Sequence, residues 1–355
     1  MKLGELILDH RLALVRATHL NDYISVLREI GAPVDRELDK SKLPSRIEDS
    51  LDLYVSIPDA VEWVARAGRD LEAMELGLLG ARRASLTALP PAAQTAIFSA
   101  QTGLMRLEAM ARISKIEDSA LEMSVRQEGD SVRVVCDMTH ISRHPFIGFA
   151  EWLNLQGVIS VVRSVAGPSW CPSEMGFVSS GHVPHAACAA FPDTRILVGQ
   201  ASSSVVVKQT ELALPTEEAQ KSTDDRLATP GIRLEQAEGW EFVSLLRRMI
   251  QPYLNEGATN VAFAAEMAGI STRTLQRLLK TSGTTYSRTL QEARFELSRE
   301  LLDDPDARII DIAMLAGYNC PQHFSRAFRR FTGVTPTRYR LSIAGGGKSA
   351  DAQGY

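Results

Sequence analysis

The amino-acid sequence predicts an α+β protein. A mixed α/β N-terminal domain is expected to precede an all-α C-terminal domain, in which a long helix joins two helix-turn-helix units. The helical domain is predicted by an amphipathic motif with a central glycine that occurs twice near the carboxyl end. Strands are predicted upstream, where apolar and polar residues alternate. The length of 355 residues is also more than one typical domain needs.

The repeated motif reads VAFAAEMAGISTRTLQRLL at residues 261–279 and IIDIAMLAGYNCPQHFSRAF at residues 309–328. In both copies an alanine, Ala265 or Ala313, stands four residues before a glycine, Gly269 or Gly317. A helix-turn-helix needs a small residue where its two helices pack and a tight turn between them, and its second helix can enter the major groove of DNA. Two copies with their glycines 48 residues apart are more specific than one.

The helices of the C-terminal half follow from apolar spacing and from capping residues. Thr259 or Asn260 is expected to cap the first helix of the first unit, and Ser271 its second helix. Pro321 suits the first turn of the second unit's second helix. A short final turn of helix is expected near Tyr339. The other predicted helices cover 240–254, a segment from 261, 272–280, 285–302, 308–316 and 321–331.

The N-terminal half mixes helices with short strands. Apolar periodicity predicts one long helix over residues 90–114 and another over 146–165. Alternation on both sides of Glu128-Gly129-Asp130 predicts a β-hairpin over 121–136. Further short strands are expected at 175–178, 196–199 and 205–207.

Composition divides the chain into segments. Residues 215–238 are polar, charged and without clear periodicity, which is typical of an interdomain linker. We therefore predict an N-terminal domain over 1–214, a linker over 215–238 and a helical domain over 239–343. The glycine-rich tail, 344–355, is expected to be disordered.

Several classes of function find no support in the sequence. No run of eighteen apolar residues predicts a membrane span, and charges interrupt the apolar pattern at the start, so we expect a cytoplasmic protein. The four cysteines are scattered and form no CxxC pair, as in a reduced protein. Neither a glycine-rich phosphate loop nor a GxSxG elbow is present. We expect no catalytic residue, no metal and no cofactor.

Some N-terminal side chains have a second interpretation. The spacing of His182, His185 and Cys188 could suit a metal, but core packing is the preferred reading, as it is for His140 and His144. Aromatic residues could line a small-molecule pocket, although core packing is commoner for them. These aromatic residues are Trp63, Trp152, Trp170 and Phe177.

Charge is unevenly distributed along the chain. The net charge is −4, which by itself argues against a partner as acidic as DNA. Residues 241–340, however, hold 14 Lys or Arg and 10 Asp or Glu, a net charge of +4, and the remainder carries −8. A basic C-terminal module on an acidic body suits a protein that binds nucleic acid with one end.

The long helix predicted over 285–302 would set the distance between the two motifs. About 18 residues at ~1.5 Å rise span roughly 27 Å. That length approaches the ~34 Å repeat of B-DNA, so the second helices of both units could enter successive major grooves.

The run from Asn260 to Arg340 resembles the DNA-binding domain of the AraC/XylS family of transcription regulators. Its most diagnostic stretch has the form IxxIAxxxGYxxxxxFSRAFRRxxGxxPxxYR, from Ile309 to Arg340. The N-terminal half more loosely resembles the arabinose-binding-like regulatory domain often fused to it. The residues that carry this likeness are the segment LREIGAP at 27–33 and the region 182–215.

The exposed faces of the second helices contain the candidate base contacts. Arg can bind guanine and Gln can bind adenine through two hydrogen bonds, and residues three or four apart share a helix face. The family pattern also places base contacts at the positions in the second helix of the first unit, for which the alternative is a solvated charged face. The candidates are Arg273, Gln276 and Arg277 in the first unit, and Gln322, His323 and Arg326 in the second.

A second group of residues is expected to contact phosphates, which adds affinity without reading sequence. Lys280, Arg329 and Arg330 carry the charges for this role. Ser271, Thr272 and Asn319 could donate hydrogen bonds to phosphates at helix starts, although ordinary capping explains them equally well.

The resemblance implies a DNA-binding transcriptional regulator with double-stranded promoter DNA as its partner. It also implies an unknown small-molecule effector, a homodimer, and activation through RNA polymerase. One alternative is a repressor or a regulator without a ligand. Another is an enzyme with a DNA-binding appendage, as in alkyl-transfer repair proteins, but such proteins need a zinc-binding cysteine cluster that four scattered cysteines do not supply.

Overall fold

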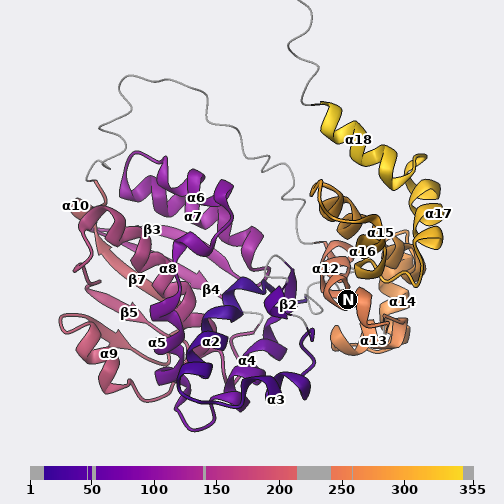
Figure 1. The fold of residues 1–355 in the computed structure, drawn as a ribbon. Coiled ribbons are helices and arrows are strands. Elements are labelled where there is room, and N and C mark those ends of the chain that lie inside the picture. Colours follow the sequence, from indigo (N-terminus) through magenta and orange to yellow (C-terminus); the bar gives the residue numbers. More distant parts are fainter. Residues whose placement is uncertain are drawn as a thin grey trace, which may run out of the picture. The chain divides into compact units, whose positions relative to one another are not determined.

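The computed structural model describes residues 12–45, 47–49, 53–138, 141–213, 241–257 and 259–346. These residues form two compact units, an N-terminal unit up to residue 213 and a helical unit from residue 241 (Figure 1). Each unit is described by itself. The predicted linker, 215–238, lies outside the described residues, as does His140.

The N-terminal unit contains two sheets. A small one pairs β1 (Leu14–Arg16) with β2 (Tyr54–Ser56) in antiparallel fashion. The larger sheet has five strands in the order β3-β4-β7-β5-β6, all antiparallel except for the pair β5 and β6. Its strands are β3 (Glu122–Glu128), β4 (Ser131–Asp137), β5 (Glu174–Gly176), β6 (Arg195–Leu197) and β7 (Ser203–Lys208).

Helices surround these sheets (Figure 1). The first are α2 (Thr18–Glu29), α3 (Val34–Asp39), α4 (Ile57–Ala67) and α5 (Ala73–Arg83). They are followed by α6 (Pro91–Phe98), α7 (Gly103–Glu117), α8 (Gly148–Ala166), α9 (His185–Ala190) and α10 (Gln209–Leu212). Two 3-10 turns lie at Ile47–Asp49 and Leu86–Ala88.

The predicted hairpin and short strands are confirmed, whereas the predicted long helix over 90–114 is wrong. The hairpin turns at Gly129, whose φ of 59° suits glycine. The chain instead forms α6 and α7 with a break between them, where Thr102 accepts a hydrogen bond from the Met105 amide and begins a new helix. Periodicity alone does not reveal such a break, because both helices direct apolar residues into one core.

The core of the N-terminal unit lies between α8, its neighbouring helices and the larger sheet. The rings of Trp152 and Phe177 contact one another there, with centroids 4.7 Å apart, and Trp63 is also fully buried. Glu151 of α8 is a buried carboxylate that accepts hydrogen bonds from the Val178 and Ser179 amides and from the Ser203 hydroxyl. These bonds satisfy the charge and join α8 to the strands. The rings of Trp63, Trp152 and Phe177 therefore pack in the core.

The metal-like triplet of His182, His185 and Cys188 lies on the surface. All three are exposed, so the expectation that they pack in the core is wrong. His144 lies 3.6 Å from Glu62 through Nε2. The described part of the chain contains no group of three or more His, Cys, Asp or Glu side chains placed to hold a metal ion. Trp170 is half-buried and donates from Nε1 to Glu211.

The helical unit begins with α12 (Phe242–Ile250), which continues as a 3-10 turn over Gln251–Glu256. One helix was expected to reach residue 254, but Pro252 lacks an amide hydrogen and the α-helix ends before it. The remaining helices are α13 (Val261–Met267), α14 (Thr272–Thr281), α15 (Tyr286–Leu302), α16 (Ile309–Leu315), α17 (Pro321–Thr332) and α18 (Pro336–Gly346).

Helix α18 is longer than the short turn expected near Tyr339, and it includes the first three residues of the predicted tail, 344–355. Tertiary contacts explain the difference. The Tyr339 ring packs edge-on against Phe328, and Arg340 donates to the Ala307 carbonyl at 2.6 Å. The remainder of that tail lies outside the described residues.

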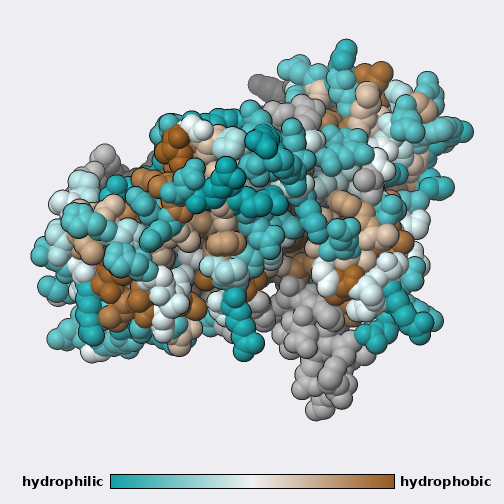
Figure 2. Space-filling model, turned by 90° about the horizontal axis from the view of Figure 1, so that it is seen from below, coloured by the Kyte–Doolittle hydropathy of each residue, from teal (hydrophilic) through white to brown (hydrophobic). Residues whose placement is uncertain are grey.

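Most large apolar side chains are buried, and hydrophilic residues predominate on the face drawn in Figure 2. The exposed large apolar residues of the helical unit include Met314, with 61% exposure. Among the described helices, none is both long enough and apolar enough to cross a bilayer.

Candidate nucleic-acid interface

The two repeated motifs form two turns with the same backbone hydrogen bonds. In the first turn, Gly269 donates to the carbonyl of Glu266 and Ile270 donates to Ala265. In the second, Gly317 donates to Met314 and Tyr318 donates to Ala313. Every donor and acceptor is shifted by 48 residues. Both glycines have positive φ angles, 65° and 77°, as these helix C-terminal turns require.

Small residues let the helices of each unit approach one another. Ala265 and Ala313 are buried to 2% and 0% exposure, so both predicted packing alanines lie in the core. The surroundings of the turn glycines differ, however. A Cβ atom on Gly317 would lie 2.3 Å from the Leu254 carbonyl oxygen, whereas one on Gly269 would meet nothing within 4 Å.

Helix α14 begins and faces as predicted. Asn260 caps α13, and Ser271 caps α14 by accepting a hydrogen bond from the Thr274 amide at 3.2 Å. One face of α14 is buried, through Leu275, Leu278 and Leu279. The opposite face exposes Arg273, Gln276, Arg277 and Lys280.

Helix α17 rests on an aromatic cluster. Phe324 and Phe328 are buried, and their rings lie 5.7 Å apart. Tyr318 packs against Phe324 at 5.5 Å, and the Arg294 guanidinium lies 5.0 Å from the Tyr318 ring centroid. This core fixes the rotation of α17 and leaves an exposed face of Gln322, His323, Arg326, Arg329 and Arg330.

The two second helices correspond with a shift of 49 residues rather than 48. The residue before the first helical position is Ser271 in one unit and Cys320 in the other, because the second turn is one residue longer. Burial follows the same shift, since Leu275 and Leu279 are matched by Phe324 and Phe328. Because of the extra residue, each exposed residue of α17 matches the residue of α14 that lies 49 positions earlier, and not the one 48 positions earlier as in the first helices of the two motifs.

This shift changes which candidate residues are equivalent. Arg277 corresponds to Arg326, Arg273 to Gln322, and Lys280 to Arg329. Gln276 corresponds to Ser325, not to His323. Ser325, which is partly exposed, is therefore a position that sequence reasoning missed, and the signal that reveals it is the phase of the buried aromatic residues.

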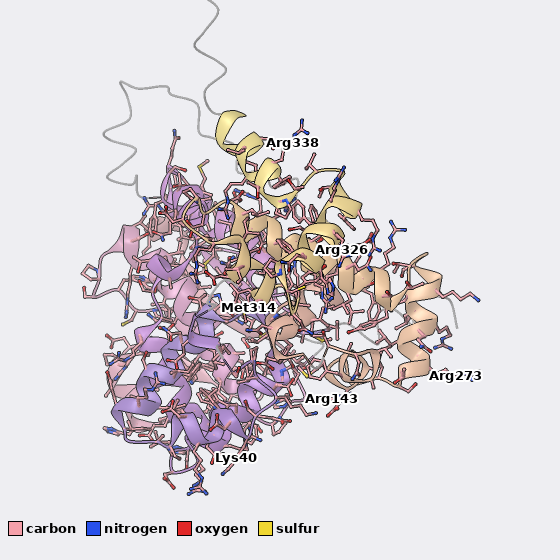
Figure 3. All side chains as sticks on the ribbon, turned by 45° about the vertical axis from the view of Figure 1, so that its right-hand side comes forward. Lys40, Arg143, Arg273, Met314, Arg326 and Arg338 are labelled. Atoms are coloured by element: carbon pink, nitrogen blue, oxygen red, sulfur yellow. The ribbon has the colours of Figure 1, made fainter. Side chains whose placement is uncertain are left out.

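All charged side chains of α14, α17 and α18 are basic. None of the three helices contains Asp or Glu, whereas α15 between them contains both acidic and basic residues. Figure 3 shows Arg273 and Arg338 projecting from α14 and α18. The basic residues of the three helices are Arg273, Arg277, Lys280, Arg326, Arg329, Arg330, Arg338 and Arg340.

Pairing separates these cations from others in the same unit. Arg247 contacts Glu292 at 3.0 Å, and Arg308 contacts Asp311 at 2.7 Å. Within the described residues no side-chain hydrogen bond or ion pair involves the six cations of α14 and α17. Exposed cations without acidic neighbours attract a polyanion without first breaking an internal ion pair.

Helix α15 connects the first helix-turn-helix unit to the second. At 17 residues, this helix spans roughly 25 Å at ~1.5 Å per residue. The Tyr286 hydroxyl at its start donates to the Thr259 carbonyl at 3.0 Å, and burial raises the pKa of Tyr286 to about 12. The phenol therefore remains a donor at neutral pH and connects α15 to the residues before α13.

Comparison with known proteins identifies both halves of the chain. Residues 31–216 match the family described as the arabinose-binding domain of AraC transcription regulator, N-terminal, which is more than half of the chain. Residues 264–342 match a helix-turn-helix domain family, and this range contains both turns described above.

Individual relatives agree with these matches. The chain is 26% identical to the HTH-type transcriptional regulator VirS of Mycobacterium tuberculosis over 339 residues, which cover 92% of this chain and 96% of that protein. It is 33% identical to the transcriptional activator NphR of Rhodococcus over 122 residues, 34% of this chain and 36% of NphR.

A solved structure, that of transcriptional regulator CdpR from Pseudomonas aeruginosa, is 22% identical with a TM-score of 0.41 and covers 91% of this chain and 96% of that one. Two helix-turn-helix units with basic exposed helices thus follow an N-terminal unit that matches a known regulatory domain. The chain belongs to the AraC family of transcription regulators and is a DNA-binding regulator with an N-terminal ligand-binding domain.

Proposed function

We propose that α14 and α17 enter two successive major grooves on one side of a promoter duplex. The domain from 239 to 343 would bind DNA, and the domain from 1 to 214 would regulate it. The observation that carries this proposal is the pair of exposed helices without acidic residues. Helix α14 precedes α15 in the chain, and α17 packs against the middle of α15 through Phe328 and Phe295. The length of α15, roughly 25 Å, allows α14 and α17 each to approach a separate groove.

Within this proposal the contacts divide into two kinds. Arg273, Gln276 and Arg277 in α14 read bases, as do Gln322, His323 and Arg326 in α17, and all six are exposed. Lys280, Arg329 and Arg330 contact phosphates, since they lie toward the ends of these helices. Ser271, Thr272 and Asn319 are assigned phosphate contacts at the helix starts. Ser271 would make this contact in addition to its capping hydrogen bond.

We further propose that the N-terminal unit senses a small molecule and forms a homodimer. Dimerisation would raise the effective concentration of the DNA-binding unit at tandem half-sites. The proposed output is activation through RNA polymerase. A reporter gene behind the chain's own upstream region tests the output. Deletion of a repressor would raise reporter expression, and deletion of an activator would lower it.

The base and phosphate roles are tested by mobility-shift titrations of Arg277→Ala and Arg330→Ala on specific and random duplexes. Arg277→Ala should weaken specific binding by roughly 1–3 kcal/mol and relax base preference at one position. Arg330→Ala should weaken binding to both duplexes and reduce the salt slope by about 0.9.

A matched control is Arg288→Ala, since Arg288 is exposed on the neighbouring α15 but contacts Glu292 at 3.0 Å. It should leave the affinity for both duplexes nearly unchanged. Equal losses for all three variants would argue against separate base and phosphate contacts.

A further inference from the structure

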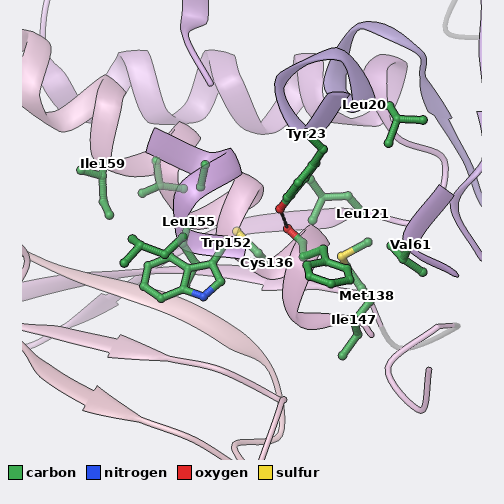
Figure 4. Close-up of a cluster of buried hydrophobic side chains, with 14 of the residues drawn as sticks. Leu20, Tyr23, Val61, Leu121, Cys136, Met138, Ile147, Trp152, Leu155 and Ile159 are labelled. Atoms are coloured by element: carbon green, nitrogen blue, oxygen red, sulfur yellow. Dashed lines mark hydrogen bonds between the residues drawn. The ribbon is translucent and has the colours of Figure 1, made fainter. Parts of the chain in front are cut away.

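A cavity lies inside the N-terminal unit among helices that are distant in sequence. Side chains from α2, α4, α7 and α8 line it, together with residues 84–86 and 88–89. The cavity volume is about 130 Å³. In Figure 4 the side chains of Leu20, Val61 and Leu121, which line it, lie on the same side of the hydrophobic cluster as Tyr23. Every wall belongs to one unit, so the cavity does not depend on how the two units are placed.

Most of the lining is apolar. Ile57, Val64, Ile97, Ile113 and Leu153 are typical of its walls. A wall of this kind binds apolar surface well, but it leaves the hydroxyl groups of a sugar without hydrogen-bond partners, at a cost of roughly 1–3 kcal/mol for each group.

The hydroxyl groups near the cavity are already bonded to the protein. The Tyr23 hydroxyl donates to the Phe149 carbonyl at 2.8 Å (Figure 4), and the Ser114 hydroxyl donates to Ala111 at 3.0 Å. The other hydroxyl and amide side chains of the lining are Ser85, Asn154 and Ser160, and each of them also has a hydrogen bond to the protein. The described lining therefore offers few of the free neutral donors and acceptors that a polyhydroxylated ligand requires.

The polar groups that remain are concentrated where α2 approaches the end of α7. His19 Nε2 lies 3.4 Å from Glu117 Oε2, and Asp22 and Asp118 lie near the same imidazole ring. All four of these residues line the cavity. Three carboxyl groups thus face one end of an otherwise apolar space.

The bonding of these carboxyl groups is incomplete. Glu117 is 5% exposed, and its Oε2 accepts no hydrogen bond within the described residues. Asp118 binds the Ala120 and Leu121 amides through Oδ1 alone. Asp22 is half-buried, and no hydrogen bond or ion pair of its side chain occurs in the described part of the chain. Burial raises the pKa of Asp22, and the neighbouring His19 and Arg83 offset only part of this increase.

The Lys and Arg side chains near this end stand outside the lining of the cavity. Among the described residues of the lining, none is Lys or Arg. Arg16 lies behind Glu117, with its Nε 3.4 Å from Oε2, and Arg83 is paired with Glu29. A ligand with a positive end would therefore gain charge-assisted hydrogen bonds here, and one with a carboxylate would be repelled.

We propose that this cavity binds an apolar molecule that carries one primary amine, with the ammonium group held against Asp22 beside Glu117 and Asp118. The proposal deepens the effector role and rests on it for biological meaning, although binding itself can be measured without DNA. It assigns a different ligand chemistry from the sugar in the name of the matched domain family.

Isothermal titration of the full-length protein with a charge series tests the assignment. The probes are 4-phenylbutylamine, 4-phenylbutan-1-ol, 4-phenylbutyrate and L-arabinose, of which the first three share one apolar body. The amine should bind about tenfold or more tightly than the alcohol, because a hydrogen bond to a charged group contributes more than a neutral one. The carboxylate should bind most weakly of the three, and arabinose should not bind.

Two variants locate the binding. Asp22→Asn should remove most of the advantage of the amine and leave the affinity for the alcohol unchanged. The matched control is Asp193→Asn, which changes an exposed carboxylate of the same unit outside the cavity. Ala150→Phe on α8 should fill the cavity and weaken both the amine and the alcohol. Thermal denaturation of each variant verifies its folding.

Several outcomes would overturn the proposal. They are the absence of binding by the whole series, equal or tighter binding of the carboxylate or arabinose, and an amine advantage that persists in Asp22→Asn. Mobility shifts with and without the probe then distinguish the two claims. Amine binding that leaves DNA affinity unaltered would remove the effector role but keep the site. A change of DNA affinity caused by another ligand class, without amine binding, would keep the effector role and remove the proposed amine site.

Discussion

Gly269 and Gly317 occupy the same place in the two helix-turn-helix units, but the structure predicts different tolerance to substitution. Both have positive φ, which costs an L-residue roughly 1–2 kcal/mol. Only at Gly317 would a Cβ also overlap a backbone carbonyl, that of Leu254 at 2.3 Å, which adds roughly 1–3 kcal/mol.

Gly317→Ala should therefore destabilise the helical unit more than Gly269→Ala. Hydrogen exchange of the α13–α14 and α16–α17 amides, followed by mass spectrometry, measures the two losses separately. Similar protection in both variants would show that the contact with Leu254 relaxes at little cost.

Asp118 gives the N-terminal unit a pH dependence of known sign. Burial raises its pKa from 3.8 to about 6, despite hydrogen bonds from the Ala120 and Leu121 amides that lower it. Between these two values the folded state binds more protons than the unfolded state. The free energy of unfolding from this group therefore falls as pH rises through that window, by roughly 3 kcal/mol at most.

Asp118→Asn should remove this dependence, because the amide oxygen can accept the same two backbone bonds. Urea denaturation at pH 4.5 and pH 7, followed by tryptophan fluorescence, tests the prediction, since Trp63, Trp152 and Trp170 all lie in this unit. The variant should gain more stability relative to the natural chain at pH 7 than at pH 4.5, by roughly 2 kcal/mol, because about a third of the loss has already occurred at pH 4.5. The same difference at both values would contradict the assignment.

The start of α14 combines a capping role with a proposed phosphate contact, and these can be separated. Ser271 accepts a hydrogen bond from the Thr274 amide, so Ser271→Ala should cost about 1 kcal/mol of stability. Ser271→Asp keeps a good cap but adds a negative charge. It should preserve thermal stability and weaken DNA binding, as measured by fluorescence anisotropy. Unchanged affinity in the Asp variant would place this helix start away from phosphates.

Other features of single elements show how far periodicity reaches. The caps at Asn260 and Ser271 were readable because capping depends on residues two or three apart. The length of α18 was not, because Tyr339 packs against Phe328 in a tertiary core that periodicity does not describe. The break before α7 was hidden because α6 and α7 direct apolar residues into one core, although its cap at Thr102 is local. The rotated face of α17 likewise depends on which aromatic rings are buried.

DNA binding by the whole protein is expected to depend strongly on salt, in spite of a net charge of −4. If Lys280, Arg329 and Arg330 each neutralise one phosphate, log K should fall against log salt with a slope of roughly −3 per chain. A footprint should cover two major grooves about one helical turn apart. Titrations between 50 and 200 mM salt, together with hydroxyl-radical footprinting, measure both. A slope near zero or a single protected groove would argue against the proposed arrangement.

The sequence by itself determined the α+β class, both helix-turn-helix units and their basic character. These depend on short-range features, since a glycine with positive φ, a capping hydroxyl and a run of cations act within a few residues. Only the tertiary structure decided the one-residue shift between Arg277 and Arg326 relative to the repeat, the burial of Glu151, and the cavity around Asp22. The shift depends on which aromatic rings are buried, and the other two features arise where segments distant in sequence meet. No local spacing records which distant side chains share a space.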